Sequence, residues 1–243
     1  MAVIKINAVS LELWVPKTEL GKRVKSGEIN NIDDILNSGI KILEPEIVDK
    51  LLPGLAVDLL EVGQSKGKFG GGKASIWKQT QKKTCEGSRT NFLACAVIGN
   101  KDGYVGLGYG SAKETVPARE KAIRNAKLNV IMIKRACGSW ACDCKQPHSI
   151  PSKVVGKSGS VVFTMIPAPR GTRLKAEKKC CKILEFAGLK DVYSKVRGQS
   201  CTKLNLFKAC FAALKQISMI KIKPEFIEEA GVVEGTLNNK EKN

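Results

Sequence analysis

The chain has 243 residues, and its 41 basic and 23 acidic side chains give a formal net charge of +18 at pH 7. Hydrophobic residues make up 43% of the sequence, which is enough for a packed core and excludes a largely disordered chain. Aromatic residues contribute only 5%, which argues against RNA binding that depends mainly on stacking bases on many rings.

Positive charge is concentrated in the middle of the chain. Residues 61–222 contain 31 basic and 9 acidic residues, whereas each flanking segment carries a net charge of −2. The charge therefore belongs to folded surface, and it predicts a polyanionic partner, of which nucleic acid is the commonest. No segment approaches the roughly 18 apolar residues of a membrane span, and no signal-peptide pattern is present. We expect a cytoplasmic protein that does not contact membranes.

The first part of the chain predicts an arm and two helices. Residues 1–30 mix polar and apolar side chains, and we expect an arm that packs against another part of the molecule. Apolar residues at helical spacing predict two helices within residues 31–54. Pro45 suits the first turn of the second helix, and Pro53 with Gly54 ends it.

A glycine- and lysine-rich segment follows at residues 62–74. Its five glycines exclude a helix or a central strand, and the segment also contains three lysines: Lys66, Lys68 and Lys73. Ala74 follows Lys73, so the spacing is not that of a nucleotide-binding P-loop. We interpret the segment as a basic loop that contacts RNA.

Three strands and a helix are predicted next. A basic turn at 82–89 separates the first two strands, and a loop with Asp-Gly chemistry at 99–103 separates the last two. The helix covers residues 114–133, with Pro117 in its first turn. The order helix, three strands, helix is that of a double-stranded-RNA-binding domain, so an α+β fold is predicted. The predicted strands are residues 74–82, 90–98 and 104–109.

Gly106, Gly108 and Gly110 alternate along the third strand and leave one of its faces without side chains. Such a face permits close approach of another backbone. The alternatives are an RNA backbone, the helix that follows, and a bulged edge strand.

A second α/β unit is predicted over residues 149–217. Its elements are strands at 154–155, 161–166 and 191–197 and helices at 175–187 and 204–217. Arg170 lies at the tip of a rigid Pro-Ala-Pro-Arg-Gly loop, where its guanidinium could clamp a phosphate. We expect the acidic tail, residues 223–243, to be mobile.

Cys137, Cys142, Cys144 and His148 lie within twelve positions, and His148 is the sole histidine of the chain. Three thiolates and one imidazole form a ligand set for tetrahedral Zn²⁺. Gly138, Pro147 and Trp140 would permit tight turns and a lid over the metal. The pattern predicts a structural zinc site that links the two domains, because four protein ligands leave no open position.

The alternative for this cluster is a set of reduced cysteines beside a surface histidine. A deaminase is disfavoured because Ile150, not glutamate, stands two residues after the histidine. A cysteine nucleophile lacks a second histidine as its base. Three other cysteines lie in apolar patterns and are expected in the core: Cys95, Cys180 and Cys210.

Several motifs in order resemble the universal ribosomal protein S5 family of the small subunit. The run GNKDGYVGLGYG at residues 99–110 is similar to the family signature, and the Cys-rich segment resembles archaeal members more than eukaryotic ones, known as S2. The resemblance covers roughly residues 12–220. Its further motifs are WVPKT at 14–18, PHSIP at 147–151, GSV at 159–161 and IPAPRGT at 166–172.

The resemblance implies a double-stranded-RNA-binding-like domain followed by an α/β domain with a left-handed crossover. It implies contacts with ribosomal RNA, with mRNA at its entrance path and with ribosomal proteins S3, S4 and S8, and a role in decoding fidelity and mRNA unwinding. We therefore divide the chain into an arm (1–30), an RNA-binding-like domain (31–136), a zinc-knuckle-like linker (137–148), a C-terminal S5 domain (149–222) and the tail. The candidate RNA contacts are Lys66, Lys68, Lys73, Lys82, Lys83, Gly87, Arg89, Gly106, Gly108, Gly110, Lys113, Arg119, Lys153, Lys157 and Arg170.

The function predicted from the sequence is that of a structural constituent of the small ribosomal subunit, without catalytic turnover. Lysine and arginine side chains would neutralise phosphates and fix the register on RNA. The alternatives are a zinc-containing RNA-binding module outside the ribosome and an RNA-processing enzyme. The enzyme is disfavoured because the basic region lacks a spare histidine, paired carboxylates and a nucleotide motif.

Overall fold

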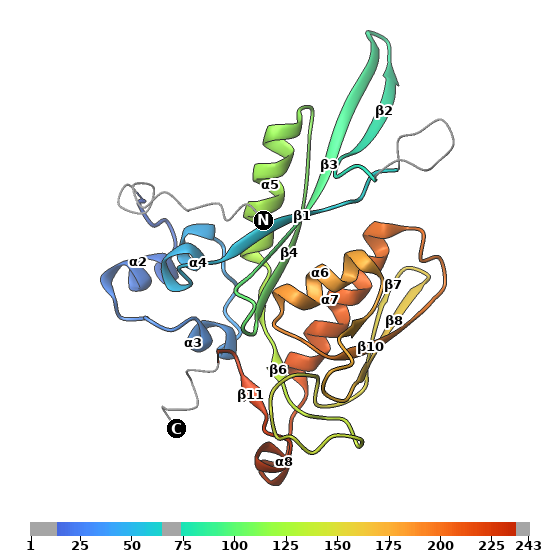
Figure 1. Ribbon diagram of the computed structural model, residues 1–243. Coiled ribbons are helices and arrows are strands. Elements are labelled where there is room, and N and C mark those ends of the chain that lie inside the picture. The colour runs from blue at the N-terminus through green and yellow to red at the C-terminus, as the bar shows by residue number, and fades with distance from the viewer. Residues whose placement is uncertain (1–13, 65–73, 237–243) are drawn as a thin grey trace. The chain divides into compact units, whose positions relative to one another are not determined.

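The structure is a computed structural model that describes residues 14–64 and 74–236 (Figure 1). Contacts divide the chain into two compact units. Unit 1 comprises Met1–Ile98 and Gly106–Val130, and unit 2 comprises Gly99–Val105 and Ile131–Asn243. Within the described residues, no helix has the length and apolar character needed to cross a membrane.

Unit 1 begins with three short helices. Both helices predicted within residues 31–54 are present, as α3 (Ile32–Asn37) and α4 (Pro45–Leu51). The arm contains an additional helix, α2 (Glu19–Ser26), which the sequence analysis missed. The Thr18 hydroxyl caps it by accepting the Gly21 N–H, and Gly27 ends it at a φ of 87°. Its sequence is largely polar, which hid the helical period.

The sheet of unit 1 contains the three predicted strands and two more. The strand order is β1-β3-β4-β5, and β2 pairs with β3 in an antiparallel hairpin. The prediction missed β1, and it extended the helix α5 (Thr115–Leu128) over the residues of β5. Asn129 caps the helix and redirects the chain into β5. The bounds are β1 Ala56–Leu60, β2 Lys78–Thr84, β3 Gly87–Gly99, β4 Tyr104–Ala112 and β5 Val130–Met132.

The sheet of unit 2 has the strand order β7-β8-β10-β9. Its helices are α6 (Lys178–Phe186), which leads from β9 to the parallel strand β10, and α7 (Lys203–Met219), which lies along β7 and β8. The helices and strands predicted over residues 149–217 are present, and β9 is an additional strand that was not expected. The bounds are β7 Val154–Ser158, β8 Val161–Pro167, β9 Leu174–Lys175 and β10 Val192–Arg197.

The expectation of a mobile tail is wrong for residues 224–234. This segment forms α8 (Pro224–Glu229) and β11 (Val233–Glu234), and β11 pairs with β6 (Lys134–Arg135). Buried Arg135 reinforces the pairing, because its guanidinium donates to the Gly235 carbonyl at 2.9 Å and to the Asp102 carboxylate at 2.6 Å. The acidic composition of the tail hid the short strand.

Candidate RNA-binding surface and candidate metal centre

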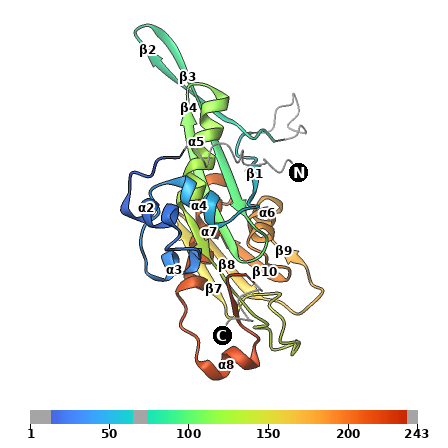
Figure 2. The ribbon, with the colours of Figure 1, turned by 90° about the vertical axis from the view of Figure 1, so that its left-hand side faces the viewer.

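The β2–β3 hairpin brings several candidate RNA contacts together. Lys82 pairs with Arg89 across the hairpin, and a tight turn at Cys85 and Glu86 connects the strands. Gly87 completes the turn at a φ of 113°, a left-handed conformation that favours glycine. The hairpin extends beyond the neighbouring strands in both views (Figures 1 and 2).

The first strand of the hairpin is polar and exposed. All residues of β2 from Lys78 to Lys83 are exposed, and lysine, glutamine and threonine make up the strand. Exposed Arg89 forms an ion pair with Glu86. On β3, Phe92 and Leu93 at the base of the hairpin are half-buried, whereas the residues next to the turn are exposed. The exposed basic part near the turn is suited to contact an anionic partner.

Lys113 and Arg119 lie at the same end of unit 1 as the hairpin turn. Lys113 follows β4, and Arg119 lies in the first turns of α5; both are exposed. The loop at residues 100–103 joins β3 to β4 at the opposite end, so the end of β4 returns toward the hairpin (Figure 1). The basic side chains of the hairpin and of the α5 start therefore share one end of this unit.

The helix α5 approaches the three alternating glycines. A Cβ on Gly108 would come 2.1 Å from the Ala126 nitrogen, and one on Gly110 would come 2.3 Å from the Ala118 oxygen. A Cβ on Gly106 would come 2.3 Å from the Ala126 oxygen, and all three glycines are buried. The helix therefore covers the face without side chains, which was one of the three predicted alternatives, while an RNA contact of these glycines stays a prediction.

The other candidates belong to unit 2 or lie outside the described residues. Lys153, Lys157 and Arg170 are exposed in unit 2. Arg170 lies in a turn in which the Thr172 hydroxyl donates to the Pro169 carbonyl at 2.8 Å. Three candidates fall outside the described residues: Lys66, Lys68 and Lys73. The described ends of their loop pair through the Gly63 N–H and the Ser75 carbonyl, 2.8 Å apart.

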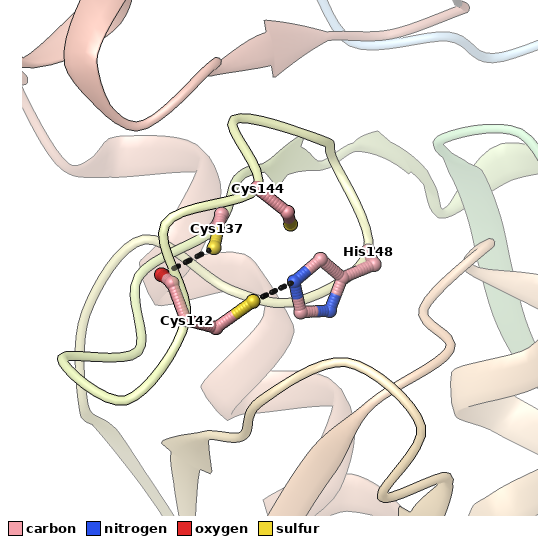
Figure 3. Close-up of side chains that lie close together, drawn as sticks. All are labelled: Cys137, Cys142, Cys144 and His148. Atoms are coloured by element: carbon pink, nitrogen blue, oxygen red, sulfur yellow. Dashed lines mark hydrogen bonds between the residues drawn. The ribbon is translucent and has the colours of Figure 1, made fainter.

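The structure brings Cys137, Cys142, Cys144 and His148 together at one point (Figure 3). Their ligand atoms all lie within 4.8 Å of one another, and Cys142 Sγ lies 3.9 Å from His148 Nε2. Zinc–sulfur bonds of about 2.3 Å place tetrahedral ligand atoms about 3.8 Å apart. The observed spacing therefore fits a four-coordinate metal, and all four residues belong to unit 2 rather than linking two units.

Backbone hydrogen bonds hold the segment that carries the cluster. The Cys137 N–H donates to the Ala230 carbonyl at 2.9 Å, so the folded tail supports the first ligand. The His148 carbonyl accepts two N–H groups, from Lys190 at 3.0 Å and from Asp191 at 3.1 Å. Elements far apart in the sequence thus position the first and the last ligand.

The thiols of the cluster differ in their surroundings. Burial raises the pKa of Cys137. The pKa of Cys142 is lowered, most strongly by the nearby Arg170 N–H and less strongly by the Cys144 side chain. An N–H donor stabilises a thiolate, which is the metal-binding form of cysteine. Trp140 is fully exposed, at 101% of its reference area, so the expected lid over the metal is wrong.

Asp191 is a residue of this site that the sequence analysis missed. Its Oδ2 lies 3.0 Å from His148 Nδ1, and both side chains are at most 6% exposed. The two atoms are close, but among the described residues no hydrogen bond to Nδ1 has the required geometry. A carboxylate beside the far nitrogen of a ligating histidine orients the ring and leaves the other nitrogen for the metal. No local motif joins the two residues in the sequence.

The remaining cysteines lie apart from this cluster. Cys95, Cys180 and Cys210 are fully buried, which confirms their predicted place in the core. Cys85 and Cys201 are exposed, and Cys181 is half-buried.

Two family models match the chain. Residues 76–134 match the N-terminal domain of ribosomal protein S5, and residues 156–225 match the C-terminal domain of ribosomal protein S5. The two matches cover the β2-to-β5 region and the α/β sheet of unit 2.

Known proteins of archaea are similar over most of the chain. A small ribosomal subunit protein uS5 of Nanoarchaeum equitans is 47% identical over 96% of this chain and 100% of its own length. A uS5 of Pyrobaculum aerophilum is 45% identical over 89% of this chain and 93% of its own. A uS5 of Methanocaldococcus jannaschii is 43% identical over 93% of this chain and 97% of its own.

Proposed function

The chain belongs to the ribosomal protein S5 family, and on this premise we propose that it binds ribosomal RNA and lines the path by which mRNA enters the small ribosomal subunit. The family is structural and not enzymatic, so the chain is a cytoplasmic component of the small ribosomal subunit without catalytic turnover. The finer role that we propose is a contribution to decoding fidelity and to the unwinding of structured messages.

The β2–β3 hairpin is the observation that carries this proposal. It carries basic side chains on both strands, and β2 is exposed from Lys78 to Lys83. Phosphate contacts from lysine and arginine fix a protein on RNA without reading its sequence. We propose that the following described residues contact RNA phosphates: Lys82, Lys83, Arg89, Lys113, Arg119, Lys153, Lys157 and Arg170, with Gly87 shaping the hairpin turn.

The family also supports finer statements about partners and architecture. We propose S3, S4 and S8 as protein neighbours, a double-stranded-RNA-binding-like character for residues 31–136, and a left-handed crossover in the C-terminal S5 domain, residues 149–222. In that domain the parallel pair β9 and β10 with α6 between them is the candidate crossover.

We further propose that the Cys137, Cys142, Cys144 and His148 cluster binds zinc as a structural ion. Zinc would supply a closed tetrahedral cross-link between Cys137 beside the tail and His148 beside β10. The donor set and the ligand spacing support this assignment. The ligand residues hold their positions through backbone hydrogen bonds on either side of the cluster.

Co-sedimentation tests the ribosomal role directly. An affinity-tagged full chain, expressed in an archaeal host, should follow the small subunit through a sucrose gradient and a high-salt wash. Release into the light fractions at high salt would instead indicate a transient RNA-binding protein.

A variant of the hairpin tests the finer role. The double variant Lys82→Glu and Lys83→Glu should lower incorporation or raise misreading in a stop-codon reporter. The double variant Lys221→Glu and Lys223→Glu makes the same change of charge elsewhere and should leave both unchanged. Normal incorporation and accuracy of the hairpin variant would contradict the proposed contact.

A further inference from the structure

We propose that the metal cluster fixes the conformation of the arginine loop, residues 168–173, and that Asp191 is the positioning residue that joins the two. Metal binding would thereby control how this loop presents Arg170 and Arg173 to phosphates. The inference rests on the proposed function in two respects, because it assumes a metal at the cluster and RNA as the partner of the loop.

The first connection runs through Asp191. One carboxylate oxygen lies 3.0 Å from His148 Nδ1, and the other accepts the Arg173 N–H at 2.7 Å. Arg173 has a φ of 62°, a left-handed conformation that a side chain other than glycine adopts only at a cost. The structure must hold Arg173 in place, and the same buried carboxylate that faces the metal ligand does so.

The second connection runs through Ser149, which directly follows the proposed histidine ligand. Its buried hydroxyl accepts the Ala168 N–H at 3.2 Å and donates to the Asp191 carbonyl at 2.5 Å. Two backbone N–H groups of the arginine loop, those of Ala168 and Arg173, thus donate to Ser149 and Asp191, which lie beside the cluster.

The arginine side chains of the loop lie at the surface, where a partner can reach them. Arg170 and Arg173 are both exposed, although the backbone N–H of Arg173 is bound to Asp191. Guanidinium groups on a fixed backbone lose less freedom when they bind a phosphate than groups on a mobile one. Loss of the metal would release His148, loosen Asp191 and so weaken phosphate binding without touching either arginine.

Hydrogen–deuterium exchange on the full chain tests the coupling in the absence of RNA. With one zinc bound, the backbone amides of residues 168–173 should exchange about tenfold more slowly than after chelation. The variant Ser149→Ala leaves all four ligands intact; it should keep one zinc and lose protection in this loop. The variant Glu228→Gln, an exposed carboxylate in α8, is the control and should change neither.

A second measurement follows binding of purified archaeal small-subunit ribosomal RNA. Chelation should weaken binding of the unmodified chain about tenfold, and the double variant Arg170→Ala and Arg173→Ala should weaken it similarly. Chelation of that double variant should then have little further effect, because metal and arginines act through one loop. An equal loss on chelation with and without the arginines would overturn the proposal.

The outcomes separate this inference from the function it rests on. A purified chain that retains no stoichiometric metal would overturn the zinc assignment and the coupling together. One zinc bound, with unchanged exchange of residues 168–173 on its removal, would overturn the coupling alone. The variant Asp191→Asn tests whether Asp191 positions the loop. It should reduce the protection of the Arg173 amide from exchange by a larger factor than it reduces the zinc bound per chain.

Discussion

Gly108 of β4 and Ala126 of α5 lie in direct contact, so that a Cβ on Gly108 would come 2.1 Å from the Ala126 backbone nitrogen. Gly106 and Gly110, two residues before and after Gly108 on the same strand, approach the backbone of α5 equally closely. The glycine-rich stretch of this family thus has a packing role in this chain. It permits a helix to lie closer to a sheet than side chains would allow.

The contact predicts a large effect of the smallest substitution. Gly108→Ala should destabilise the chain by about 2–4 kcal/mol, because the added methyl group meets backbone atoms that cannot move independently. Thermal unfolding would measure the loss. Ser111→Ala, an exposed position in the same strand, should change stability by less than about 0.5 kcal/mol. Equal melting temperatures for the two variants would contradict the close approach.

Metal removal should destabilise unit 2. A chain with one bound zinc should lose about 10 °C of melting temperature on chelation, since a ligand at about 1,000 times its Kd adds about 4 kcal/mol. Cys144→Ser should abolish stoichiometric zinc, as measured by elemental analysis. Cys85→Ser removes an exposed thiol outside the cluster and should retain the metal.

The hairpin should contribute to RNA affinity in a salt-dependent manner. Lys82→Glu with Lys83→Glu should lower the slope of log affinity against log salt by about 1–2, because each lost phosphate contact removes about 0.7–0.9. Filter binding to small-subunit ribosomal RNA at several KCl concentrations would measure this slope. An unchanged slope would place the phosphate contacts elsewhere.

Glu44 should stabilise the N-terminal part of unit 1 in a pH-dependent manner. Its carboxylate accepts the N–H groups of Lys17 at 2.9 Å and Thr18 at 2.7 Å, and the indole N–H of Trp14 at 2.9 Å. Burial by itself raises the pKa of Glu44, but these donors outweigh it, and the net pKa lies below the ordinary 4.5. A lowered folded pKa means that the stabilisation is complete above pH 4.5 and is lost as the pH falls through the folded value.

The variant Glu44→Ala isolates this contribution. It should lower the free energy of unfolding by about 1–2 kcal/mol at pH 7, and the difference from the unmodified chain should shrink below pH 4.5. Denaturant unfolding at a series of pH values would measure it. A difference that stays constant down to pH 3 would show that the charge of the carboxylate is not involved.

Local patterns were sufficient for much of this protein. Helical spacing located α3 and α4, and apolar runs between turn residues located β3, β4 and the main elements of unit 2. The proposed metal ligands lie within twelve positions, so their spacing alone was enough to predict the cluster that the structure brings together. The errors fell on short elements whose sequences carry little period, such as β1, β9 and the largely polar α2.

The sequence by itself determined the charge of the central segment, the ligand set and the family motifs, because each is written in residues that are neighbours along the chain. Only the tertiary structure decided that α5 covers the glycine face and that Asp191 meets His148. It also decided that Arg135 binds the Gly235 carbonyl, 100 residues away. Such contacts depend on packing between distant segments, and no local period or spacing encodes them.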